Sequence, residues 1–204
     1  MLPMSPTFIW IGIVALVVVL LAVLFAATYN RLVTLRQRYL NAYAQIDVQL
    51  KRRYDLIPNL VETVKGYMAH ERQTLEAVTA ARNAAAEASA RVTSNPRDNA
   101  AMLSLAGAEN ALLGALGRFM ALREAYPNLK ADAHASELME QLASTENRIA
   151  FARQNYNDSV MQYNATRQTF PTALLAGMLG FNEAALFQID DAKQREVVPV
   201  SLGT

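Results

Sequence analysis

Cysteine is absent from the 204 residues of this chain, and histidine occurs only at His70 and His134. The lack of thiols excludes disulfide bonds, cysteine nucleophiles and cysteine-ligated zinc, and it agrees with a reducing compartment such as the cytoplasm. His70 does not begin a zinc-binding HExxH motif, because the second histidine would have to stand where the chain has Thr74. The ExxH motif of helical di-iron proteins is also missing. We therefore expect no metal site and no cofactor.

Glycine and proline are sparse, with 8 and 7 residues, and no stretch alternates apolar and polar residues as a half-buried strand would. The chain is therefore expected to be all-α. Its formal net charge of +1 argues against a dedicated nucleic-acid-binding protein. We find no phosphate loop, no dinucleotide fingerprint and no nucleophile beside a base. These absences favour a protein that is not an enzyme.

One long apolar run, from Phe8 to Ala27, contains no charged residue and no proline. About 20 helical residues span roughly 30 Å, the thickness of the hydrocarbon core of a bilayer. A cleaved signal peptide is the alternative, but it requires a basic N-terminal region and a small residue at the −3 position. Residues 1–7 contain no Lys or Arg, and cleavage after Ala27 would put Phe25 at that position. We therefore expect a retained transmembrane helix over residues 8–28.

The orientation of this helix is predicted from the positive charges that flank it. Arg31, Arg36 and Arg38 follow the apolar run, and no Lys or Arg precedes it. The positive-inside rule then predicts a single-pass protein with a short external N-terminus, residues 1–7, and its main domain in the cytoplasm.

Four amphipathic helices are predicted in residues 29–171, because apolar residues recur there at steps of three and four. The first helix should continue the transmembrane helix as far as Arg53. Pro58 is expected to begin the second helix, with residues 55–57 forming the reversal. The architecture expected from these helices is an antiparallel up-down-up-down four-helix bundle.

The later part of the chain supplies the third and fourth helices and a C-terminal extension. A turn at residues 94–96 precedes the third helix, and a connection at 128–136 precedes the fourth, which should end near Pro171. Beyond it, residues 172–204 are expected to form a short apolar helical segment and a loosely ordered tail. Three glycines of the third helix are expected at close helix contacts that compensate their low helix propensity. They are Gly107, Gly114 and Gly117.

Local motifs throughout the chain are similar to those of one family. The sequence closely resembles the LemA family of bacterial membrane-anchored proteins from Tyr29 to about Phe187. The resemblance implies a four-helix bundle on an N-terminal membrane helix with an external N-terminus, and therefore the bacterial inner (cytoplasmic) membrane. It implies no reaction, because the family has no established biochemical activity. The motifs are the stretch Gln45–Tyr67 and the shorter matches Tyr29-Asn30, His70-Glu71, Ala81-Arg82, Glu146-Asn147-Arg148-Ile149, Tyr156-Asn157, Tyr163-Asn164, Phe170-Pro171 and Gly180-Phe181.

Three charged residues fall on or near the apolar stripes of the predicted helices: Glu71, Glu109 and Arg153. A buried carboxylate is costly unless it is paired and hydrogen-bonded. The favoured interpretation is therefore a structural polar layer that fixes the register of the helices. A ligand or proton site made by the same residues is the functional alternative, and carboxylates that face water are the third interpretation.

Three further sets of residues are candidates for assembly or partner contacts. The first is the apolar stripe of helix one beyond the membrane, which has the period of a coiled coil. The second is a basic triplet at the predicted end of that helix, where interaction with the helix C-terminus is the simpler account. The third is the C-terminal apolar segment, which could instead pack on its own bundle. In this order, the residues are Leu32, Leu35 and Tyr39; Lys51, Arg52 and Arg53; and Leu174, Leu175, Met178, Leu179, Phe181, Leu186 and Phe187.

The sequence thus favours a non-enzymatic, membrane-anchored scaffold that contacts lipid, forms a homo-oligomer, binds protein partners and binds no nucleic acid. The resemblance to the LemA family adds a membrane peptidase as a candidate partner, and envelope stress or membrane protein quality control as a candidate role. The alternative is a ligand-sensing, metal-sensing or enzymatic bundle with a polar site around Glu71, Glu109 and Arg153.

Overall fold

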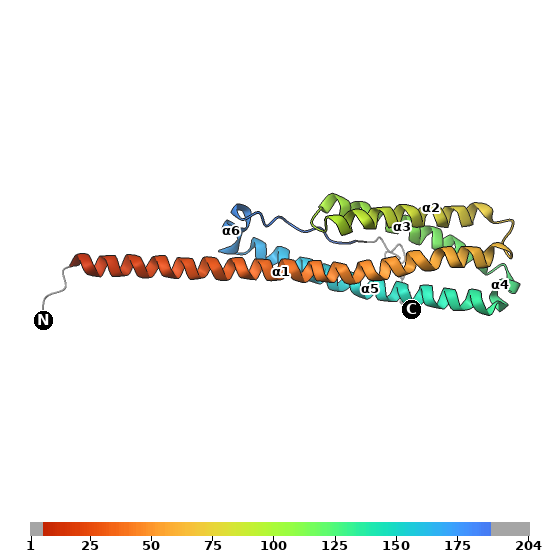
Figure 1. The fold of residues 1–204 in the computed structure, drawn as a ribbon, viewed down its shortest axis with the longest axis horizontal. Helices are drawn as coiled ribbons and strands as arrows, with labels where there is room; N and C mark the ends of the chain where they lie inside the picture. Colours follow the sequence, from red (N-terminus) through yellow and green to blue (C-terminus); the bar gives the residue numbers. More distant parts are fainter. Residues whose placement is uncertain (1–5, 189–204) are drawn as a thin grey trace, which may run out of the picture.

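A computed structural model describes residues 6–188 of the chain, and in this range every regular element is a helix. The predicted all-helical class is confirmed. Four long helices lie lengthwise beside one another, and two short ones stand at the ends of this helical body (Figure 1). The helices are α1 Pro6–Lys65, α2 Arg72–Ser94, α3 Asn99–Arg123, α4 Pro127–Ala131, α5 Ala133–Gln168 and α6 Thr172–Met178.

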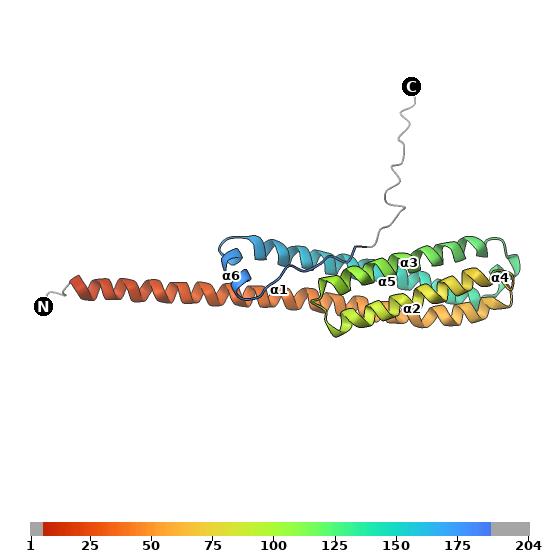
Figure 2. The same ribbon diagram turned by 90° about the horizontal axis from the view of Figure 1, so that it is seen from above.

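The N-terminal part of α1 projects far beyond the other helices (Figures 1 and 2). From Trp10 to Ala27 every side chain is exposed, and the first buried residue is Thr28. The most apolar 18-residue window of this helix has a mean hydropathy of 3.0 and is only 6% buried. Length and composition therefore suit residues 10–27 to a membrane span, and no other part of the described chain covers them. We call these residues the apolar section of α1.

Helix α3 is also long and apolar enough for a membrane span. Its apolar window is 39% buried, however, and Leu105, Leu112 and Phe119 lie in the core of the body. Its hydropathy is thus accounted for by packing inside the body.

The predicted reversal at residues 55–57 is wrong. Helix α1 continues through Pro58 to Lys65, and the chain reverses at residues 66–71. The basic triplet of residues 51–53 therefore lies inside a helix and not at its end.

The helix tolerates Pro58 because another helix replaces the missing hydrogen-bond donor. A proline within a helix leaves the carbonyl four residues earlier without its usual N–H partner, and here that carbonyl belongs to Tyr54. The Arg82 side chain of α2 donates instead, with its Nε 2.9 Å from the Tyr54 oxygen. Ile57 and Leu60 are also buried on either side of the proline. Packing and the replacement bond together keep α1 continuous.

Helix α5 packs along α1, and α2 and α3 form a helical hairpin that joins this pair through α2. The figures show the chain direction reversing from α1 to α2, from α2 to α3, and again at α5 (Figures 1 and 2). The connection expected at residues 128–136 contains the short helix α4, whose Leu129 is fully buried. Helix α5 begins at once afterwards, because Asp132 caps it by accepting from the backbone N–H of Ala135 at 2.7 Å.

The apolar stripe of α1 beyond the membrane section is covered by the chain itself. Leu32, Leu35 and Tyr39 are 0%, 6% and 4% exposed, so they are not free assembly contacts as predicted. Helix α5, α6 and the segment after α6 reach further toward the apolar section of α1 than the α2–α3 hairpin does (Figure 2). They bury the stripe where it leaves the proposed membrane.

The three glycines of α3 do not mark close helix contacts, contrary to expectation. Gly107, Gly114 and Gly117 are exposed, and a Cβ built on any of them meets no atom within 4 Å. Gly180 is different, because its φ of 69° lies in the left-handed region that favours glycine.

We expect Gly114→Ala and Gly117→Ala each to raise the free energy of unfolding by about 0.5–1 kcal/mol, since alanine loses less backbone entropy in a helix. Gly180→Ala is the matched control and should lower it by about 1–2 kcal/mol, because a Cβ disfavours that conformation. Thermal unfolding of the purified full-length variants measures both. Destabilisation by the α3 substitutions would show that those positions are covered by another molecule.

The predicted C-terminal helical segment is only partly helical. Helix α6 ends at Met178, and residues 179–188 have no helical or strand assignment. They run back along the body from α6 (Figure 2). Residues 189–204, to which the predicted loosely ordered tail belongs, lie outside the described residues.

Candidate functional site

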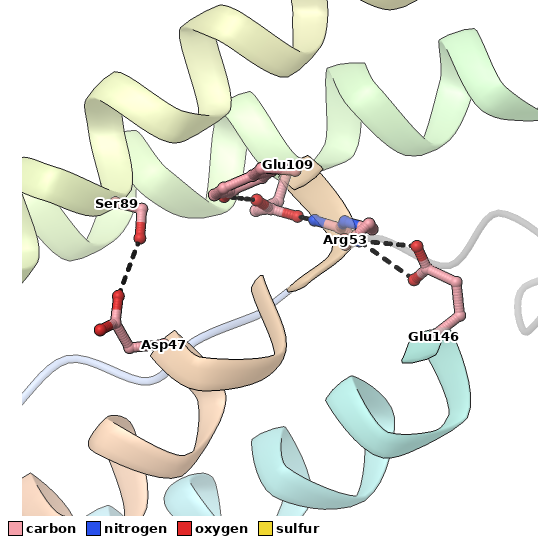
Figure 3. Close-up of polar contacts among 6 residues, drawn as sticks. Asp47, Arg53, Ser89, Glu109 and Glu146 are labelled. Atoms are coloured by element: carbon pink, nitrogen blue, oxygen red, sulfur yellow. Dashed lines mark hydrogen bonds and ion pairs between the residues drawn. The ribbon is translucent and has the colours of Figure 1, made fainter. Parts of the chain in front are cut away.

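A buried ion-pair cluster joins three helices near the middle of the body (Figure 3). Arg53 of α1 and Glu109 of α3 are both 0% exposed and form a salt bridge through Arg53 Nη2. The other guanidinium nitrogen, Nη1, lies 2.9 Å and 3.0 Å from the two carboxylate oxygens of Glu146 on α5. Tyr54 donates its hydroxyl hydrogen to the second oxygen of Glu109. One arginine thus links α1 to α3 and α5.

The cluster is suited to fixing helix register. Its buried charges carry a large desolvation cost, which good geometry and additional hydrogen bonds must offset. Glu109 forms an ion pair with Arg53 and accepts a further hydrogen bond from Tyr54. Glu146 is the only member that reaches solvent, with its side chain 29% exposed. Sliding one helix along another would separate charges that cannot be hydrated inside the body.

A second polar cluster joins α1 to α2. Asp47 accepts a hydrogen bond from Ser89 at 3.3 Å (Figure 3). It also accepts one from Thr93 at 3.0 Å, and Lys51 pairs with it at 2.6 Å. Asp47 and Ser89 are buried, whereas Thr93 and Lys51 are exposed. The cluster therefore connects the side of α1 that faces α2 to α2 itself.

The three charged residues expected in one polar layer do not meet. Glu109 is buried as expected, but its partner is Arg53. Glu71 precedes α2 at the far end of the body, where its Oε1 accepts from the Tyr126 hydroxyl at 3.1 Å. Arg153 is half-buried on α5 and joins neither carboxylate. The predicted group fails because helical periodicity reports which face of a helix is buried, and not the level at which two helices meet.

The remaining candidates divide between the surface and the core. Arg52 is exposed, whereas Arg53 beside it is fully buried. In the C-terminal segment, Phe181 and Phe187 pack in the core, and Leu174 and Met178 are exposed. Half-buried positions complete the set: Leu175, Leu179 and Leu186.

Asparagine side chains hold the extended C-terminal segment. Asn164 of α5 donates to the carbonyl of Ala184 at 2.9 Å and accepts from its N–H at 3.0 Å. Asn157, two turns earlier, makes the same pair of bonds to Phe187 at 3.2 Å and 2.9 Å. Asn99 of α3 bonds to the opposite edge of the segment. Its side chain donates to the carbonyl of Glu183 and accepts from the N–H of Ala185, both at 2.9 Å.

Further donors complete this contact, which we call the asparagine ladder. Tyr163 donates to the carbonyl of Asn182 at 2.7 Å, Tyr156 to that of Ala185 at 2.9 Å, and Arg167 to that of Phe181 at 2.7 Å. Almost every bond goes to the backbone of the segment, so the ladder recognises an extended chain more than particular side chains. The segment is thereby hydrogen-bonded to both α3 and α5.

The tyrosines between α1 and α5 form an aromatic cluster beneath the segment. Tyr39 lies with its ring centroid 5.2 Å from that of Tyr163 and 6.3 Å from that of Tyr156. Burial raises the pKa of Tyr43 to about 12, and that of Tyr54 near the ion-pair cluster to about 12 as well. Both hydroxyls therefore stay neutral at physiological pH.

Sequence analysis missed the role of the ladder, although a signal was present. The pair Tyr-Asn occurs at 156–157 and again at 163–164, a spacing that places both pairs on one helix face. Glu146 was likewise part of a recognised motif without an assigned partner. Both the partner of Glu146, which is Arg53, and the segment that the asparagines bind lie elsewhere in the sequence.

These features define a class of protein: a helical body whose central helix continues as an apolar section, and whose polar side chains hold its own helices and the segment after α6. Among residues 6–188, no three His, Asp or Glu side chains are grouped as a metal-ligand set.

The chain belongs to the LemA family, whose sequence model matches residues 42–202. It is similar to magnetosome protein MamQ 2 of Paramagnetospirillum magneticum, with 29% identity over 90% of this chain and 75% of the relative. Magnetosome protein MamQ of Magnetospirillum gryphiswaldense is 28% identical over 83% of this chain and 68% of its own length. Protein LemA of Metamycoplasma hominis is 24% identical over 82% and 72%. The matched range includes the ion-pair cluster and the asparagine ladder.

Proposed function

We propose that this chain is a non-enzymatic scaffold of the LemA type, a four-helix bundle anchored in the bacterial inner membrane that self-associates and binds protein partners. The observation that carries the proposal is the continuity of α1, which is the apolar section and the central helix of the body at once. A domain built on such a helix is held at a set distance from the bilayer. Its polar clusters are occupied with internal contacts, which suits a structural role.

The orientation proposed is N-terminus outside and body in the cytoplasm. Arg31, Arg36 and Arg38 follow the apolar section directly, and the first acidic residue of the chain is Asp47. This excess of positive charge is retained on the cytoplasmic side during insertion.

A reporter enzyme that works only outside the inner membrane should therefore stay inactive when fused after Thr204, in a chain that still reaches the membrane. The same reporter fused before residue 8 should be active and serves as the control. Activity of the C-terminal fusion would reject the proposed location and every cytoplasmic partner with it.

Self-association is proposed at a groove between α1 and α5, since the stripe predicted for it is buried. The groove is lined by Gln45, Val48, Arg148, Phe151 and Asn155. Val48 is 61% exposed and Phe151 is 75% exposed. Exposed aliphatic and aromatic side chains rimmed by polar ones are typical of protein–protein contact surfaces.

For protein partners, the family resemblance leads us to propose a membrane peptidase and a role in envelope stress or membrane protein quality control. The alternative ligand site has no comparable support, because Glu71 and Glu109 bind different partners within the body.

A further inference from the structure

Three large apolar side chains at one end of the body have no cover. Phe170, Leu174 and Met178 are 84%, 65% and 85% exposed, and they fall on α6 and just before it. Leu174 and Met178 are one turn apart, so they lie on the same side of the helix. Such a concentration of exposed apolar surface within a short element indicates an interaction. We call these three residues the α6 apolar face.

Helix α6 lies at the level where the apolar section of α1 ends. It occupies the end of the body nearest that section in both views (Figures 1 and 2). The chain just after it is fixed to α1, because the Phe181 ring packs edge-on against Tyr29 at 5.8 Å between centroids. The Arg36 guanidinium lies over the same ring, 4.7 Å from its centroid. Burial of α1 begins at Thr28. These contacts hold α6 beside the point where α1 leaves the proposed membrane.

The segments at this end of the body carry positive charge. Residues 28–46 of α1 include Arg31, Arg36 and Arg38 and no Asp or Glu, and residues 159–182 include Arg167 and no Asp or Glu. Arg31 and Arg38 are exposed. Basic groups close to a bilayer attract anionic lipid headgroups by about 1 kcal/mol each. Apolar and basic residues at one level suit the interface of a membrane better than a second protein surface.

We propose that the α6 apolar face inserts into the membrane interface beside α1, as a second contact between the body and the lipid. The proposal rests on the membrane anchoring proposed above. Apolar side chains that bind a membrane surface lie about 5–10 Å deep, in the boundary between headgroups and acyl chains. A single helix would leave the body free to rotate about the α1 axis. A second contact would prevent this rotation and fix the orientation of the body relative to the membrane surface.

The test uses the full-length chain in vesicles of zwitterionic and anionic phospholipid. Because the chain has no cysteine, single variants take one fluorescent label each. Leu174→Cys and Met178→Cys report on α6, Val18→Cys on the apolar section, and Glu62→Cys on the far end of the body. Part of the phospholipid carries a quencher near the start of its acyl chain. The labels at 174 and 178 should lose roughly half of their emission, and the label at 62 should lose almost none.

The outcomes separate the two proposals. An unquenched label at position 18 would defeat the membrane anchor itself. Quenching at 18, with labels at 174 and 178 as bright as the label at 62, would overturn the interfacial contact and leave the anchor intact. Emission at 174 and 178 that changes with protein concentration but not with the quencher would assign the face to a second copy and also overturn the proposal.

Discussion

Arg53→Met should lower the free energy of unfolding by about 3–5 kcal/mol. This is the largest loss of stability that we predict for a single substitution in this chain. The reason is that Glu109 is fully buried and would keep its charge without a cationic partner. Glu146 would be less affected, because its side chain reaches water. Denaturation of the full-length protein, monitored through the loss of its helical signal, measures the change in the free energy of unfolding.

Two further variants distinguish the buried charge from general disruption. Arg52→Met removes a neighbouring exposed arginine and should leave stability within about 0.5 kcal/mol of the parent. Arg53→Met combined with Glu109→Gln removes both charges, keeps an acceptor for the Tyr54 hydroxyl, and should recover most of the loss. If the double variant is as unstable as the single one, the cluster does not act as a charge pair.

Asn164→Ala should release the C-terminal segment while the helical body remains folded. The substitution removes both hydrogen bonds to Ala184, each worth about 1 kcal/mol net. A local loss of about 1–2 kcal/mol raises the open population roughly 5- to 30-fold. The amides of Ala184 and Phe187 should exchange with solvent faster by that factor, as measured by hydrogen exchange of the full-length chain.

The matched control is Asn155→Ala, because Asn155 is exposed on the same helix and its side chain makes no hydrogen bond to the described residues of the segment. Exchange at Ala184 and Phe187 should be unchanged in it. Equal exchange in the Asn164 variant and the parent would mean that the Asn164 hydrogen bonds do not hold the segment.

The sequence predicted the helical class and the apolar section, since these depend on local periodicity and run length. It failed at Pro58 because a proline is read as a helix break from local rules, whereas the Arg82 donor lies on another helix. The same limit explains the assignment of Leu32 to an assembly surface. Its burial was visible in the stripe, but the covering element was not.

The site was predictable only in part. A carboxylate at Glu109 on an apolar face had to be paired, and this inference holds. Its partner could not be chosen from the pattern, because Arg53 lies on a different helix and at a level that only the packed structure sets. The asparagine ladder was harder still, since its partner is the backbone of an extended segment, which has no side-chain signature.

The central claim, a self-associating membrane scaffold, is tested most directly by the mass of the full-length chain in mild detergent. We expect a particle of several chains for the parent, and a smaller one for Phe151→Asp, which places a charge in the groove between α1 and α5. Leu103→Asp on α3 is the control, because Leu103 is similarly exposed but lies outside the groove, and it should keep the parent mass. Single chains for the parent across the micromolar range would contradict the account.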